Sequence, residues 1–101
     1  MGDAALFANT GNDNTAIGHE ALGACTTAPS NVAVGSLALR FLTASDGMNV
    51  AIGADAGDSI TTGQRNVLVG TNANPSSATA SRQYVFAVSY THLTLPTTPY
   101  V

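Results

Sequence analysis

The stretch Asn31-Val-Ala-Val-Gly35 decides the fold, because it recurs along the chain at a nearly constant spacing. A similar stretch begins 17 residues earlier, another 18 residues later, and a fourth 17 residues after that. Self-similarity at a fixed period is the signature of a repeat architecture, in which each repeat forms one structural unit. The four copies occupy residues 14–18, 31–35, 49–53 and 66–70.

Each position of the repeat has a physical role. The two Val residues of 31–35 are two apart, so they share one face of a short strand, while Asn and Ala lie on the other. The Gly ends the strand where a positive φ or a close backbone approach is needed. An Ala three residues later opens a turn, for which one helical turn is a candidate form. Stacking would turn these positions into ladders: Asn14, Asn31, Asn49 and Asn66; Ile17, Val34, Ile52 and Val69; Gly18, Gly35, Gly53 and Gly70; Ala21, Ala38, Ala56 and Ala73.

The pattern predicts a mainly β fold, a β-solenoid or β-roll of 17–18-residue repeats with short strands and short turns. Successive layers would lie about 4.8 Å apart, the strand spacing of a sheet. We interpret the Asn residues as ladder and corner residues rather than ligands. Val, Ile and Leu are expected to supply the buried apolar ladder, about three well-buried side chains per layer.

The repeat region is predicted to cover residues 1–74, with a partial repeat at 1–13 and full repeats starting at 14, 31, 49 and 66. In the partial copy, Gly2-Asp-Ala-Ala-Leu6 matches Gly18-His-Glu-Ala-Leu22, so the chain is expected to begin within a repeat. Residues 75–87 are interpreted as a terminal segment of the repeat region.

Composition restricts the partners. The 101 residues suffice for one domain, and only 9% of them are charged. Three scattered Arg and a net charge of -3 argue against nucleic acid as a partner. No apolar run approaches the ~20 residues of a membrane span, so membrane insertion is not expected. The lone Cys25 excludes an internal disulfide and is interpreted as a small filler.

The sequence also predicts self-association. A thin coil without Trp and with few other aromatic residues buries little surface, while ordering each residue costs about 1–2 kcal/mol. Three chains that bury a common axis would supply the missing contacts. We therefore expect a homotrimer.

The repeat Asn-Thr-Ala-Ile-Gly-x-x-Ala-Leu at 14–22, followed by another Asn-x-Ala-Val-Gly, resembles the repeats of phage tail-fibre and tailspike proteins. Similar repeats occur in the heads of trimeric bacterial surface adhesins, usually with a shorter period. Residues 75–86 resemble the segment that, in such fibres, often precedes an intramolecular chaperone of the S74 peptidase type. Where those proteins usually have Gly after the last apolar strand, this chain has Ala87.

The resemblance implies a structural shaft or neck segment of a phage or prophage tail fibre, located in the virion and involved in host attachment. Other parts of the full protein would then bind the host receptor or glycan. One alternative is the head of a trimeric adhesin on the bacterial surface. Another is the non-catalytic part of a tailspike that cleaves host glycan.

The last segment departs from the repeat. Val88-Ser-Tyr-Thr-His-Leu-Thr-Leu-Pro-Thr97 resembles an in-frame translation of a transposon-end sequencing adapter, so 88–101 are expected to be a non-native tail. The alternative is a genuine strand, because the stretch alternates in polarity.

No catalytic or cofactor motif is present. The pair His19-Glu20 follows Gly18 in a variable part of the repeat and is interpreted as a solvated corner. Asp55 and Asp58 are three residues apart and could share a cation, but no Asp-x-Asp-x-Asp-Gly calcium loop surrounds them. We therefore expect no enzyme activity, no cofactor and no metal site.

Overall fold

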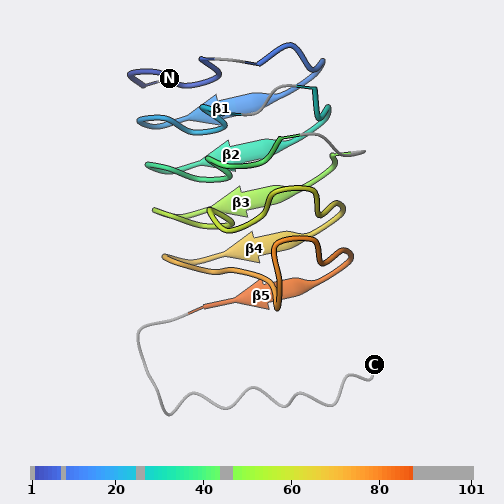
Figure 1. Ribbon diagram of the computed structural model, residues 1–101. Helices are drawn as coiled ribbons and strands as arrows, with labels where there is room; N and C mark the ends of the chain where they lie inside the picture. The colour runs from blue at the N-terminus through green and yellow to red at the C-terminus, as the bar shows by residue number, and fades with distance from the viewer. Residues whose placement is uncertain (1, 8, 25–26, 44–46, 88–101) are drawn as a thin grey trace.

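The computed structural model describes residues 2–7, 9–24, 27–43 and 47–87, which wind into a β-solenoid (Figure 1). The Cys25 and 88–101 predictions lie outside these residues. From residue 15 on, each coil contributes one three-residue strand, and the strands form one parallel sheet in chain order. The described part holds no helix, so the predicted mainly β solenoid is confirmed. The strands are β1 (Thr15–Ile17), β2 (Val32–Val34), β3 (Val50–Ile52), β4 (Val67–Val69) and β5 (Tyr84–Phe86).

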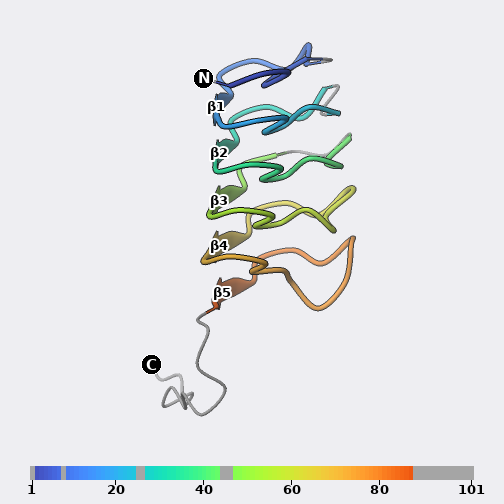
Figure 2. The ribbon, with the colours of Figure 1, turned by 90° about the vertical axis from the view of Figure 1, so that its left-hand side faces the viewer.

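The register of the sheet shows that one repeat is one turn of the solenoid. Ala33, at the centre of β2, lies opposite Ala16 in β1 and Ala51 in β3. In β4 the same position is occupied by Leu68. Figure 2 shows the strands stacked along one side while the rest of each coil extends away from them. Equivalent residues of successive repeats therefore lie directly above one another.

A fifth strand lies within the segment 75–87, where no further repeat was predicted. β5 pairs with β4, so that Val67 lies opposite Tyr84 and Val69 lies opposite Phe86. Gln83 takes the place of the Asn, and its backbone N–H donates to Asn66 Oδ1 at 2.9 Å. Gln83 follows Asn66 by 17 residues, so the spacing held the signal although the residue types had changed.

The turn after each strand is not helical. Ala21 N–H donates to Gly18 O at 3.2 Å, which closes a tight turn. The next residues, Leu22 and Leu39 in the second and third coils, have φ values of +53° and +52°, in the left-handed region. This conformation lets Leu22 N–H donate to Ala38 O of the next coil at 2.9 Å. A helical turn would keep such bonds within one coil, whereas stacking needs them between coils.

Small side chains fill most of the interior. At the centres of the strands, Ala16, Ala33 and Ala51 are almost completely buried. The two walls of each coil can lie close together because few large side chains separate them. The remaining buried apolar residues are Ala21, Leu22, Ala28, Ala38, Leu39, Leu42, Ala56, Ile60, Leu68 and Ala73.

At one pair of positions, a larger side chain in one place makes up for a missing side chain in another. Gly57 stands where the second and third coils have Leu22 and Leu39. A Cβ on Gly57 would lie 2.7 Å from Leu39 Cδ2 and 2.9 Å from Leu68 Cδ1. Leu68 is larger than the Ala that β1, β2 and β3 place at this position, and it fills the space that Gly57 leaves empty. The two departures from the repeat therefore depend on each other.

The substitution Leu68→Ala is expected to lower the free energy of unfolding by about 2–5 kcal/mol. Gly57 beside it has no side chain that could move into the cavity. Urea unfolding followed by circular dichroism measures the change. Thr71→Ala, at an exposed position of the same coil, should stay within about 0.5 kcal/mol of the parent chain. Equal losses of unfolding free energy in both variants would show that Leu68 does not fill the space beside Gly57.

Candidate functional site

The structure places the four Asn residues of the repeat in one column inside the solenoid. Asn14 is partly buried, while Asn31, Asn49 and Asn66 are completely buried. The backbone N–H of each of the last three residues donates to Oδ1 of the Asn one coil earlier. These distances are 2.8 Å for Asn31 to Asn14, 2.9 Å for Asn49 to Asn31 and 3.0 Å for Asn66 to Asn49. Each Asn side chain therefore links its own coil to the backbone of the next coil.

The buried amides of this column are satisfied by the chain itself. Asn49 Nδ2 donates to Asn31 Oδ1 at 3.2 Å and to the corner carbonyl of Gly63 at 3.1 Å. Asn66 Nδ2 donates in the same way to Asn49 Oδ1 and to Ala80 O. A buried amide is tolerated when its donors and acceptors are paired. The column leaves no free group for a ligand, so its role is to hold the coils in register.

The Gly column lies beside the strands and allows the coils to approach closely. Gly18, Gly35, Gly53 and Gly70 have φ values between +121° and +133°. A Cβ on Gly53 would lie 2.6 Å from the carbonyl carbon of Gly70, which no side chain can accommodate. Ala87 occupies this column in the last coil that the structure describes. Ala21, Ala38, Ala56 and Ala73 form the next column, and all four are buried.

The Val and Ile column lies on the outside of the solenoid, so the expectation that it is buried was wrong. Ile17 is 47% exposed and Ile52 is 42% exposed, while Val34 and Val69 are half-buried. The alternation along the strand correctly separates Val and Ile from Asn and Ala, but the face that carries Asn and Ala is the one that points inward. The coil is too narrow to hold branched side chains from every strand in addition to the Asn amides and the buried Leu residues.

The outward side of the sheet is a continuous apolar face, which we call the outward face. Its ten positions are Thr15, Val32, Val50, Val67 and Tyr84 in one row and Ile17, Val34, Ile52, Val69 and Phe86 in the other. None of these residues is charged. Tyr84 and Phe86 are 75% and 57% exposed. A contiguous exposed apolar patch of this kind is typical of an interaction surface.

Among the described residues, His19, Asp3 and Asp13 are exposed, while Glu20, Asp55 and Asp58 are partly buried. His19 Nε2 is 3.2 Å from Glu20 Oε2, and His19 Nδ1 is 3.8 Å from Asp3 Oδ2. Asp58 Oδ1 accepts a hydrogen bond from Asn74 Nδ2 at 3.2 Å. Among the described residues, no group of three or more His, Cys, Asp or Glu is arranged to hold a metal ion. These groups contact one another across coils in the manner of surface residues.

No protein-family model, curated protein or solved structure matches the chain. In the part of the chain that the structure describes, no helix is long and apolar enough to cross a membrane.

Replacing one buried amide should disturb the whole column. In Asn49→Ala, the backbone N–H of Asn66 loses its acceptor, and a buried unsatisfied group costs about 1–3 kcal/mol. We expect the thermal midpoint to fall and amide exchange to accelerate in β3 and β4. Asn12→Ala, at an exposed position, serves as the matched control. Similar midpoints for the two variants would show that the column does not hold the coils together.

Proposed function

We propose that the chain is a structural shaft or neck segment of a phage or prophage tail fibre, in which three copies associate through the outward face. The single observation that carries this proposal is the uncharged apolar outward face, which the solenoid does not cover with any part of its own described chain. Removing such a surface from water contributes about 25 cal/mol for each Å² buried.

The spacing of the outward face suits a second copy of the same chain. Its side chains repeat with the coil, so two copies present matching rows at the same interval. Val, Ile and Thr have few rotamers, which lowers the entropy lost when they pack. Homo-oligomers usually close by symmetry, and threefold closure would bring the outward faces together around one axis. The resemblance of the repeats to those of trimeric fibres supports three copies rather than two.

A role as a spacer fits the interior as well as the surface. The Asn, Gly and Ala columns are all explained by stacking. Each added repeat would lengthen the rod by one strand spacing, about 4.8 Å. Such a rod holds other parts of a fibre at a fixed distance from the virion, which is what a shaft does.

A charge placed on the outward face should prevent association. The full chain is expected to have a mass three times 10.1 kDa by light scattering coupled to size exclusion. Ile52→Asp would bury a carboxylate at the threefold axis, which is strongly unfavourable, so this variant should elute as a monomer. Thr62→Asp, exposed at a corner away from the strands, should remain trimeric. A monomeric parent chain would contradict the proposal.

The location can be tested separately from the assembly. Antibodies raised against the chain should decorate virion tails when immunogold-labelled particles are viewed by electron microscopy. Label on the bacterial envelope instead of the virion would overturn the fibre assignment in favour of a surface adhesin, while the trimer would stand.

A further inference from the structure

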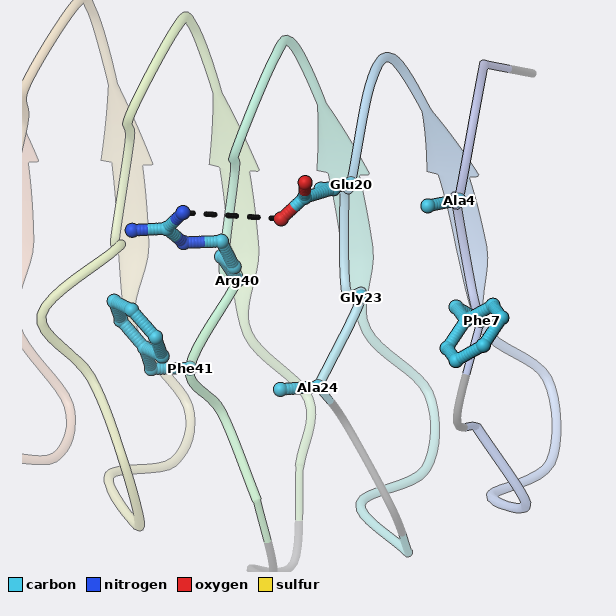
Figure 3. A pocket seen from close by; sticks show the side chains of 7 residues that line it. All are labelled: Ala4, Phe7, Glu20, Gly23, Ala24, Arg40 and Phe41. Carbon is cyan, nitrogen blue, oxygen red and sulfur yellow. Dashed lines mark ion pairs between the residues drawn. The ribbon is translucent and has the colours of Figure 1, made fainter.

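A cavity of about 320 Å³ lies on the turns of the first three coils, away from the outward face. Figure 3 shows its side chains: Phe7 stands at one end and Phe41 at the other, with Gly23 and Ala24 on the backbone between them. Glu20 and Arg40 lie along one edge and are joined by an ion pair. None of these residues belongs to the outward face. Pockets of about 300 Å³ are at the small end of ligand sites, which suits one ring-sized group.

The cavity exists because the middle coil carries small residues where its neighbours carry large ones. Ala24 N–H donates to Arg40 O at 3.0 Å, which aligns the second coil with the third. In this alignment Gly23 lies between Phe7 and Arg40. Side chains two coils apart are separated by about 9.6 Å, twice the strand spacing. A ring in van der Waals contact on both sides needs about 7–8 Å, so one ring fits.

The walls of the cavity are apolar and exposed. Phe7 is 82% exposed and Phe41 is 45% exposed. The Arg40 guanidinium lies 4.2 Å from the centre of the Phe41 ring and covers one face of this ring. Aromatic faces attract groups with a partial positive charge, among them the C–H groups of a saturated ring. A ligand with one C–H-rich face would therefore cover surface that the chain leaves in water.

The edge of the cavity offers both an acceptor and donors. Arg40 Nη1 lies 3.7 Å from Glu20 Oε1, which is too long for a hydrogen bond, so both groups can still bond to a ligand. Arg40 Nε is buried and has no hydrogen-bond partner. An oxygen brought by a ligand could satisfy this donor after a small shift of the side chain. The two charges cancel, so the edge favours a neutral ligand whose hydroxyl groups both donate and accept.

We propose that this cavity binds one neutral hexopyranose unit of a glycan, with its C–H face against Phe7 or Phe41 and its hydroxyl groups on Glu20 and Arg40. A pyranose ring combines the required thickness, a C–H face and a rim of hydroxyl groups. An aromatic peptide side chain would fill the same space but would bring no oxygen to Arg40 Nε, which would stay without a hydrogen-bond partner. This site is independent of the shaft role, because it uses different residues and lies within one chain.

The test is an NMR titration of the ¹⁵N-labelled full chain with methyl glycosides of glucose, galactose, mannose, N-acetylglucosamine and N-acetylgalactosamine. At least one should cause saturable shifts at the backbone amides of Gly23, Ala24 and Arg40, with a Kd in the millimolar range expected for one ring, roughly 1–10 mM. Shifts should be absent from the amides of β4 and β5, which lie two or more coils from Arg40.

Two variants probe the cavity in opposite ways. Phe41→Ala removes an aromatic wall, and Ala24→Leu fills the space between the walls. Each should weaken binding by about tenfold or more. Phe86→Ala removes an aromatic ring from the outward face, where Phe86 is more exposed than Phe41, and should leave the affinity unchanged. Ile52→Asp should also bind normally, so failure of the trimer and failure of this site can be told apart.

Several results would overturn the proposal. One is the absence of saturable shifts with all five glycosides. Another is binding of N-acetyltyrosinamide at Gly23 and Ala24 without binding of any glycoside, which would identify a peptide site instead. Equal loss of affinity in Phe86→Ala and Phe41→Ala would show that binding does not occur in the cavity.

Discussion

The structure depends on one hydrogen bond that recurs between coils, from the backbone N–H of each ladder residue to Oδ1 of the Asn one coil earlier. This bond connects neighbouring coils at Asn31, Asn49 and Asn66. Without it, the coils would be paired only along strands of three residues. Strands of three residues are marginal by themselves. The buried Asn that precedes the strand adds further hydrogen bonds to this pairing. It also fixes the register, because a slip by one residue would leave the buried amide without its partners.

The amide column also decides what the rest of the coil can contain. Since Asn and its corner carbonyls occupy one side of the interior, the strand centre has room for Ala and, beside Gly57, for one Leu68. The branched side chains are consequently placed on the outward face. The same constraint that makes each coil thin thus produces the apolar surface that we propose for association.

The corners are free to vary because they take little part in the packing. Phe7, Gly23 and Arg40 each follow the equivalent Leu in three successive coils, yet they differ completely in size and charge. This variation produces the cavity between Phe7 and Phe41 without disturbing the columns beside it. A repeat scaffold can therefore carry a local binding site in one coil while its stacking stays uniform.

The sequence by itself determined the period, the strand positions, the parallel stacking and the columns of Asn, Gly and Ala, because equivalent residues of a solenoid must stack. It could not determine which face of each strand lies inside. Alternation separates two faces, but only the width of the closed coil shows that Asn and Ala fit inside while Val and Ile do not. The fifth strand, whose Gln83 takes the place of Asn at the same 17-residue spacing, was recognised only from its pairing with β4, and the alignment of Phe7 and Arg40 around Gly23 also emerged only in three dimensions. Both depend on contacts between coils, which residue types alone do not specify.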